Sequence, residues 1–312
     1  MLCASILSFS YAENVVDLRE EGILNLISEN LNGTEDIVLL PEFCLGPTIS
    51  ELGDSFLSGI AKLAAENNVY IQAAVNRKLT EKSHANSAIL FDKDGEAAFI
   101  YDKVYPYWSE YDREDSDIIP GNGAVFADTH FGRVSAAICF DANFSNLWQD
   151  ISDLDVDVVF FSSAYSAGRQ LSAHALNHHY AIVTSTLKPD FAVYDIDGRE
   201  VTYNRCQPQQ ILVSRTRIDL DRVICHHNFN REKILAMLTD HPGEIELEHD
   251  YEREEWCVIR SVTPQTNVRA LCRKYGIESL RDYKRRSRAY ADNIRNAMQC
   301  NAMQRNVIHH TK

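Results

Sequence analysis

The chain has 312 residues, of which 45% are hydrophobic and 24% charged, and its formal net charge is −14. This composition is typical of a globular protein with enough apolar residues for a core, and it excludes extensive disorder. The negative charge argues against a nucleic-acid partner, because binding to phosphates depends mainly on Lys and Arg. No stretch approaches the ~18 apolar residues of a membrane-spanning helix, so no membrane anchor is predicted.

The cysteines and histidines bear on the cellular compartment and on metal binding. Eight cysteines are scattered without C-x-x-C pairs, which predicts reduced thiols and a cytoplasmic location. Residues 1–12 are apolar but lack the basic start of a secretory signal, and we interpret them as a first strand. Eleven histidines occur without an H-E-x-x-H motif or a Cys/His ligand spacing, so no metal site is predicted.

Short apolar runs alternate with helical patterns along the chain, which is typical of an α/β fold. In chain order, the pattern predicts strand 1–12, helix 17–30, strand 36–40, helix 51–67, strand 69–75, strands 86–91 and 96–101 joined by a tight turn, strand 134–138, helix 146–154, strand 156–162, helix 170–179, strand 181–185, a turn at 195–199 and strand 210–215. No internal repeat is visible. The sequence therefore predicts a single α/β domain over residues 1–225.

The character of the sequence changes near residue 226. Residues 244–255 are strongly acidic, whereas basic residues crowd one predicted helix over residues 281–288. Roughly 85 residues with sparse apolar runs make a marginal independent core. We therefore interpret residues 226–312 as a helical C-terminal extension that contributes to a subunit interface or covers the site.

Three polar residues each follow a predicted strand. Glu42 lies in the run LLPEF, Lys103 in YDKVY and Cys139 in AICFD. The ends of strands are where α/β sheets collect catalytic groups. Singly, each residue has an ordinary structural explanation: a solvated Glu, an exposed Lys or an inert core thiol. In this order and in these local sequences, the three together are much more specific.

With these motifs, the sequence resembles the nitrilase, or carbon–nitrogen hydrolase, superfamily over residues 1–225, whose members share a Glu, Lys, Cys triad in this order. The resemblance implies a four-layer α-β-β-α sandwich that associates as a homodimer. It also implies hydrolysis of nonpeptide amides, carbamoyl groups or nitriles through a cysteine acyl-thioester. No cofactor is needed for such a reaction.

Elementary thiol chemistry agrees with these roles. A thiol with a pKa near ~8.5 is only a few per cent thiolate at neutral pH, so it benefits from a neighbouring base and a cation. Glu42 supplies a general base that also acts as the acid, and Lys103 supplies the cation. The oxyanion would be stabilised by Lys103 and by the backbone N–H of Phe140.

Further residues are candidates for substrate binding. Glu110 matches a second glutamate that many members of the superfamily carry, although it also begins an acidic stretch that could simply be solvated. Asn143 stands where relatives acting on carboxylate-bearing substrates often have Arg, so we expect a substrate that is neutral or cationic near the scissile group. Arg169 could reach the site from a loop, but a surface position is the more ordinary one.

Aromatic residues near the predicted site are candidates for its walls. Trp108 and Tyr165 are expected to line the pocket, whereas Trp148 fits core packing better. Tyr105 occupies a position where many relatives have His, which changes the pocket wall without affecting the triad.

The sequence leaves several alternatives open. A thioester intermediate could pass its acyl group to an amine instead of water, and a nitrile could replace the amide as substrate. A noncatalytic binding protein on the same fold is a further alternative, although an intact triad opposes it. The acyl and amine parts of the substrate are not determined by the sequence.

Overall fold

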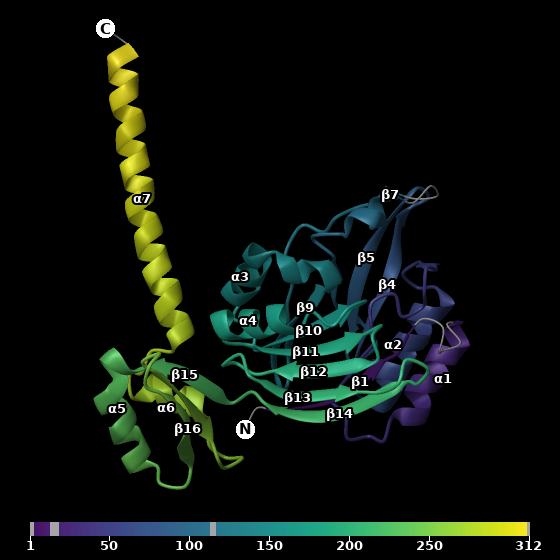
Figure 1. The fold of residues 1–312 in the computed structure, drawn as a ribbon, viewed down its shortest axis with the longest axis horizontal. Helices are drawn as coiled ribbons and strands as arrows, with labels where there is room; N and C mark the ends of the chain where they lie inside the picture. The colour runs from purple at the N-terminus through teal and green to yellow at the C-terminus, as the bar shows by residue number, and fades with distance from the viewer. Residues whose placement is uncertain (1–2, 13–18, 113–116, 311–312) are drawn as a thin grey trace. The chain divides into compact units, whose positions relative to one another are not determined.

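The computed structural model describes residues 3–12, 19–112 and 117–310, with the backbone alone for 299–310. These residues divide into two compact units, one extending to Leu220 and the other starting at Asp221 (Figure 1). Sequence analysis placed this boundary after residue 225. The structure places it earlier because strand β15 (Arg222–His226) pairs with a strand of the second unit.

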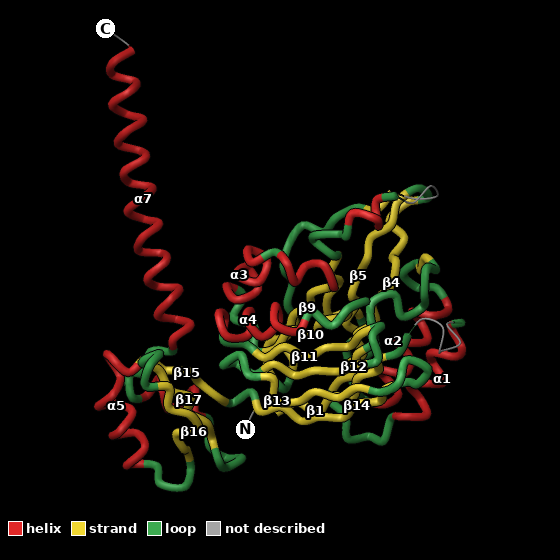
Figure 2. The backbone as a smooth tube through the Cα atoms, in the orientation of Figure 1, coloured by secondary structure: helices red, strands yellow, loops and turns green. Residues whose placement is uncertain are grey.

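The first unit contains two sheets (Figure 2). The first sheet has the order β14-β1-β2-β4-β5-β6, in which β1, β2 and β4 are parallel. Its strands are β1 (Cys3–Ser10), β2 (Ile37–Leu39), β4 (Tyr70–Thr80), β5 (Ser83–Phe91), β6 (Ala97–Asp102) and β14 (Leu212–Asp219), with the short β3 (Ile49–Ser50) and β7 (Asp117–Ile118) at the side. Of the predicted first strand, residues 1 and 2 lie outside the described residues.

The second sheet has the order β13-β12-β11-β10-β9-β8, with β9, β10 and β11 parallel. Its strands are β8 (Ala127–Thr129), β9 (Gly132–Ile138), β10 (Val158–Ser163), β11 (Ala181–Thr186), β12 (Asp190–Tyr194) and β13 (Glu200–Arg205). Because β9 and β10 run in the same direction, residues that follow them emerge at one edge of this sheet. That edge carries the predicted nucleophile.

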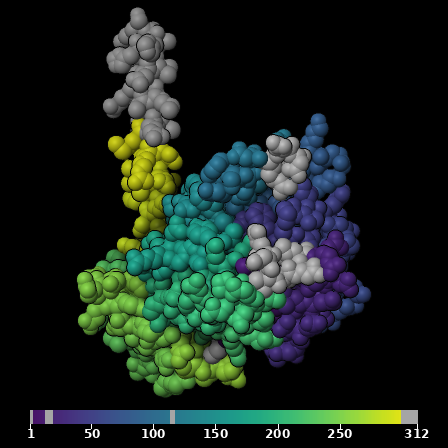
Figure 3. All heavy atoms as spheres, turned by 45° about the vertical axis from the view of Figure 1, so that its right-hand side comes forward, coloured from purple at the N-terminus to yellow at the C-terminus, as the bar shows by residue number. Residues whose placement is uncertain are grey.

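Two pairs of helices cover the outer faces of the sheets. Helices α1 (Glu20–Asn30) and α2 (Ser55–Asn67) pack on the first sheet, and α3 (Ser145–Asp153) and α4 (Gly168–His178) on the second. The four-layer α-β-β-α sandwich is confirmed. Figure 3 shows one face of the molecule with all heavy atoms. Residues 17 and 18 of the first predicted helix lie outside the described residues.

Alternating side chains explain why the sheets pack on both faces. In β2, Ile37 and Leu39 face the core between the sheets, whereas Val38 faces helices α1 and α2, as expected from the two-residue period of a strand. Polar groups cross the core in bonded pairs: Gln72 Nε2 donates to Ser162 Oγ at 3.1 Å, and Ser162 Oγ donates to the carbonyl of Leu40 at 2.8 Å. Such bonds fix the position of one sheet on the other.

Helix α2 shows how local sequence defines the helix boundaries. The side chain of Asp54 accepts a hydrogen bond from Leu57 N at 2.8 Å, which satisfies one of the free donors of the first turn. Asn68 ends the helix in the left-handed conformation with φ 52°, as is common at helix ends. The predicted start at residue 51 was four residues early, because the chain first makes a turn.

The second unit has its own sheet, which sequence analysis did not anticipate. Its strands have the order β15-β17-β16, with β16 (Ile245–Tyr251) and β17 (Trp256–Ser261) forming a hairpin. Helices α5 (His227–Asp240), α6 (Val268–Lys274) and α7 (Leu280–His310) complete it. A core of ten buried hydrophobic residues, including Cys225, Met237 and Ile259, holds the unit together. The acidic run hid β16, an edge strand whose glutamates alternate with Ile245 and Leu247.

Among the described residues, no helix combines the length and the apolar character needed to cross a membrane.

Gly121 supports the position of the predicted catalytic lysine. Its N–H donates to the Lys103 carbonyl at 2.9 Å, and an added Cβ would lie 1.9 Å from the carbonyl oxygen of Asp102. We expect Gly121→Ala to lower the free energy of unfolding by about 1–3 kcal/mol, because the backbone must move to relieve the overlap. Urea unfolding measures this. Gly168→Ala, at a helix start with nothing within 4 Å, is the control and should not be destabilised. Equal stability of both variants would contradict the close approach at Gly121.

Candidate active site

Glu42 is held rigidly just beyond the end of β2. Its side chain is 1% exposed. Oε1 accepts hydrogen bonds from Lys103 Nζ and Asn86 Nδ2, both at 2.8 Å, and Oε2 accepts one from Ala164 N at 2.8 Å. The donors come from the loops after β6 and β10 and from β5, so three strands fix this carboxylate in one orientation.

Lys103 follows β6, and its N–H donates to the carbonyl of Asn86 at 2.8 Å. Its buried ammonium donates to Glu42 Oε1 at 2.8 Å and to Glu110 Oε1 at 2.6 Å. Burial alone would lower the pKa of Lys103, but attraction to Glu42, Cys139 and Glu110 outweighs it and raises the pKa above its ordinary value. Lys103 therefore carries a permanent positive charge in the site.

Cys139 begins a short 3₁₀ helix, η2 (Cys139–Asn143), directly after β9, and its φ is 48°. A non-glycine residue in this left-handed region needs support from its surroundings. The buried Asp141 provides this support: Oδ2 accepts hydrogen bonds from Ile138 N at 3.0 Å and from the Tyr101 hydroxyl at 2.6 Å, and Oδ1 accepts one from Tyr105 N at 2.9 Å. Burial raises the pKa of Asp141 to about 6, against the lowering effect of these bonds.

The electrostatics of the site keep the thiol protonated. Burial and the repulsion of Glu42 raise the pKa of Cys139 to about 12, although Lys103 acts in the opposite direction. At neutral pH the sulfur is therefore a neutral thiol, and it needs a base before it can act as a nucleophile.

Glu110 lies beside Lys103 in the pocket. It is part of a 3₁₀ helix, η1 (Trp108–Tyr111), and its Oε1 also accepts a hydrogen bond from Tyr107 N at 2.7 Å. Its Oε2 accepts one from Asn86 Nδ2 at 2.9 Å. Asn86 thus bridges Glu110 and Glu42, the two carboxylates that flank the ammonium.

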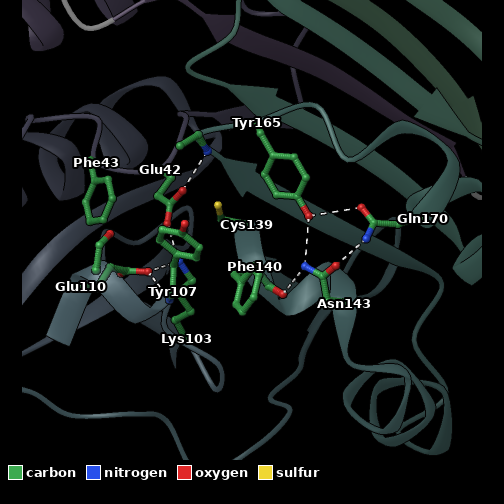
Figure 4. Close-up of a pocket in the computed structure, with 12 residues that line it drawn as sticks. Glu42, Phe43, Lys103, Tyr107, Glu110, Cys139, Phe140, Asn143, Tyr165 and Gln170 are labelled. Atoms are coloured by element: carbon green, nitrogen blue, oxygen red, sulfur yellow. Dashed lines mark hydrogen bonds and ion pairs between the residues drawn. The ribbon is translucent and has the colours of Figure 1, made fainter.

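A pocket of about 480 Å³ joins these groups (Figure 4). It is lined by Glu42, Phe43, Lys103, Tyr107, Ser109, Glu110, Cys139, Phe140, Asn143, Ala164, Tyr165 and Gln170. The positively charged and acidic residues lie on one side of Cys139, and Asn143, Tyr165 and Gln170 lie on the other. This arrangement presents a thiol, a carboxylate and an ammonium to one small molecule.

The comparisons with known proteins agree with this geometry. The model of the carbon-nitrogen hydrolase family matches residues 20–185, more than half of the chain. The chain belongs to the carbon-nitrogen hydrolase family. The matched range includes Glu42, Lys103 and Cys139.

Individual relatives of this carbon-nitrogen hydrolase are distant. The deaminated glutathione amidase of Yersinia enterocolitica is 25% identical over 116 residues, which cover 34% of this chain and 41% of that protein. A second similar protein is a mutant of the amidase from Nesterenkonia sp. AN1 with acrylamide added at its active site cysteine. Its structure has a TM-score of 0.59 at 14% identity, and the match covers 69% of this chain and 92% of that protein. A carbon-nitrogen hydrolase superfamily protein from Xanthomonas campestris has a TM-score of 0.60 at 19% identity. The match covers 77% of this chain and 97% of that protein. The two structures share the fold.

Most of the predicted site residues of this carbon-nitrogen hydrolase lie around one pocket, but Trp108 does not. Its side chain is 64% exposed, and Tyr107 lines the pocket instead. Tyr107 directly precedes η1, and its N–H donates to Glu110 Oε1 at 2.7 Å, so these two residues line the pocket together while Trp108 does not. Arg169 is exposed and is not among the lining residues, while Trp148 is fully buried, as expected.

Three residues at the candidate site of this carbon-nitrogen hydrolase were missed by sequence analysis. Asn86 binds both glutamates, Asp141 supports the nucleophile turn and Gln170 lines the pocket. Asn86 did not stand out in the sequence, because it lies in the polar half of β5 between His84 and Ser87. For Gln170 the sequence carried no signal. Among the described residues, no group of three or more His, Cys, Asp or Glu side chains could hold a metal ion.

The raised pKa of Cys139 predicts how this carbon-nitrogen hydrolase reacts with a thiol reagent. Modification by methyl methanethiosulfonate requires the thiolate, so its rate at Cys139 should rise about tenfold per pH unit from pH 7 to 9 without levelling. Peptide mass spectrometry at each pH measures the rate, and Cys139→Ala corrects for Cys3 and Cys206, which are partly exposed. Levelling between pH 8 and 9 would mean that the thiol titrates like a free cysteine.

Proposed function

We propose that this protein hydrolyses a small nonpeptide amide through an acyl-thioester on Cys139. The observation that carries the proposal is that Glu42, Lys103 and Cys139 line one pocket large enough for a small molecule. A base, a permanent cation and a nucleophile are the three groups that acyl transfer from an amide requires.

In the first half-reaction, Glu42 takes the proton of Cys139 while the sulfur attacks the carbonyl carbon of the amide. The coupling of the two events follows from the raised pKa of the thiol, because little free thiolate exists beforehand. The oxygen becomes an oxyanion, which Lys103 and the backbone N–H of Phe140 stabilise. Donors of this kind are typically worth on the order of 10²–10³ in rate.

Glu42 completes the first half-reaction and then acts again in the second. It passes its proton to the nitrogen as the C–N bond breaks, so the amine leaves as a neutral molecule and the acyl group remains on sulfur. Glu42 then takes a proton from water, whose oxygen attacks the thioester carbon. Collapse of this intermediate breaks the C–S bond, and the proton returns to Cys139. The products are one amine and one carboxylic acid for one amide and one water.

Glu110 and Asn86 act through the residues that they hold. Glu110 contacts the ammonium of Lys103 and Asn86 donates to Glu42, so each restricts a group that must meet the substrate in a fixed geometry. Such positioning contributes to rate by keeping the reacting atoms in place.

The relatives support this choice of reaction. Amidases of Yersinia enterocolitica and Nesterenkonia sp. AN1 are similar to this chain, and in a mutant of the latter acrylamide or an acetamide moiety is attached to the active site cysteine. Ammonia release from a panel of amides, carbamoyl compounds and nitriles, with and without added amines, distinguishes hydrolysis of amides from the nitrile and acyl-transfer alternatives.

The triad roles predict different defects for different substitutions. Cys139→Ala should abolish ammonia release while leaving the fold intact. Glu42→Gln should lower kcat by about 10²–10⁴, because the residue acts in both half-reactions. Lys103→Met should lower kcat more than it raises KM, as expected for a group that acts mainly in the transition state. Steady-state kinetics with one amide tests all three.

The intermediate itself can also be detected. A short pulse of a slow substrate, followed by intact-mass spectrometry, should show an acyl adduct on the wild-type protein and none on Cys139→Ala. Double variants that combine Cys139→Ala with Glu42→Gln or Lys103→Met should resemble Cys139→Ala alone, because no chemical step remains to be slowed. An adduct on Cys44 or Cys206, or turnover by Cys139→Ala, would disprove the assignment.

We further propose that the protein forms at least a homodimer through its C-terminal unit. Tyr290, Ile294 and Met298 on α7 are largely exposed and lie four residues apart, on one side of the helix. Replacing all three with Ser should shift the molecular mass in light scattering towards the monomer. The control replaces Val201 and Tyr203, which are exposed on β13. A wild-type monomer, or equal dissociation of the control, would contradict the proposal.

A further inference from the structure

The pocket has a second polar end, across Cys139 from the charged residues (Figure 4). It consists of Asn143 at the end of η2, Tyr165 after β10 and Gln170 in the first turn of α4. None of these three side chains takes part in the proposed reaction. Their chemistry therefore bears on which substrate the pocket accepts.

The charge of the pocket limits the choice. Of the described residues that line it, Glu42 and Glu110 are carboxylates and Lys103 is the single cation. With a neutral thiol at Cys139, the pocket carries a formal charge of −1, from two negative groups and one positive group. The ammonium is already bound by both carboxylates. An anionic substrate would therefore enter against net repulsion.

The three polar side chains form a closed hydrogen-bonded group. Asn143 Nδ2 donates to the carbonyl of Phe140 at 3.1 Å and lies 3.5 Å from the Tyr165 hydroxyl. The Tyr165 hydroxyl donates to Gln170 Oε1 at 3.3 Å, and Gln170 Nε2 donates to Asn143 Oδ1 at 2.6 Å. These bonds hold the two amides in a fixed relative orientation before any substrate arrives.

The group retains hydrogen-bonding capacity for a ligand. A carboxamide has two N–H donors and two acceptor lone pairs on its oxygen. The bonds between the described residues use one N–H and one lone pair of Gln170, and one lone pair of Asn143 Oδ1. One donor on Gln170 and two acceptor positions, on Gln170 Oε1 and Asn143 Oδ1, remain.

We propose that Gln170, together with Asn143, determines specificity for an acyl chain that ends in an uncharged carboxamide. This inference rests on the proposed amide hydrolysis and specifies its substrate class. A carboxamide offers N–H donors to the two free acceptors and a carbonyl to the free N–H of Gln170. A carboxylate offers acceptors alone. It would leave the side-chain oxygens of Gln170 and Asn143 without a donor, and the net negative charge of the pocket would repel it. An ammonium group would satisfy the acceptors but not the donor.

The experiment compares three substrates of equal length with the full-length protein: glutaramide, the monoamide of glutarate, and pentanamide. Ammonia release gives kcat/KM for each. After division by two for its equivalent amides, glutaramide should exceed pentanamide by about three- to thirtyfold, the effect of one or two added neutral hydrogen bonds. The glutarate monoamide should be the poorest. Malonamide, succinamide and adipamide extend the series in case another chain length spans the pocket.

Variants of Gln170 test its role directly. Gln170→Leu should bring one ratio close to one: the kcat/KM of the best diamide divided by that of the alkyl amide of the same chain length, such as glutaramide over pentanamide. Gln170→Glu keeps the size of the side chain and adds a negative charge, so it should shift preference from glutaramide to 5-aminopentanamide. The matched control is Gln149→Leu on α3, a residue outside the pocket that bonds to Asp153, and its ratio should equal that of the wild type.

The outcomes separate this inference from the proposed function. If the glutarate monoamide is the best substrate, or if the ratio is the same in the wild type, Gln170→Leu and Gln170→Glu, the inference is wrong while amide hydrolysis stands. If no amide releases ammonia and Cys139 forms no acyl adduct, the proposed function fails, and the inference fails with it.

Discussion

The buried ammonium of Lys103 is the constraint on which the rest of the site depends. A charge taken out of water costs several kcal/mol unless partners surround it, and here Glu42 and Glu110 bind it at 2.8 and 2.6 Å. Glu42 follows β2 and Lys103 follows β6, two strands of the first sheet, so their ion pair forms only when this sheet is assembled. Removing one partner would leave an uncompensated charge in the interior. This explains why Asn86, Gly121 and the turn of η1 all hold this cluster in place.

The same cluster acts on Cys139, the proposed nucleophile. Burial and the repulsion of Glu42 outweigh the attraction of Lys103 and keep the pKa of Cys139 high. A neutral thiol protects the site from unspecific oxidation and alkylation, since the thiolate is the reactive form. The arrangement therefore favours a mechanism in which proton removal by Glu42 and attack on the substrate occur together.

Much of the fold, and the three polar residues that meet in the pocket, could be predicted because both depend on local signals. Apolar runs gave the strands, and polar residues at strand ends gave Glu42, Lys103 and Cys139. Trp108 was placed wrongly because its direction depends on the phase of a 3₁₀ helix, which neighbouring residues do not encode. Gln170 was missed because its partner Asn143 lies 27 residues away. The sheet of the second unit was obscured by its acidic edge strand.

The two ends of the pocket are built in different ways, and this difference matters for how the substrate range can change. Glu42 is bound by a backbone N–H and by side chains from separate strands, so altering it disturbs the whole cluster. Asn143, Tyr165 and Gln170 bond mainly to one another on short loops and helix ends. Because these residues share no described hydrogen bond with the charged group, substitutions among them can alter the accepted acyl group while the ion pairs around Lys103 stay intact. Residues on loops and element ends, positioned by a rigid scaffold, are where specificity is usually adjusted.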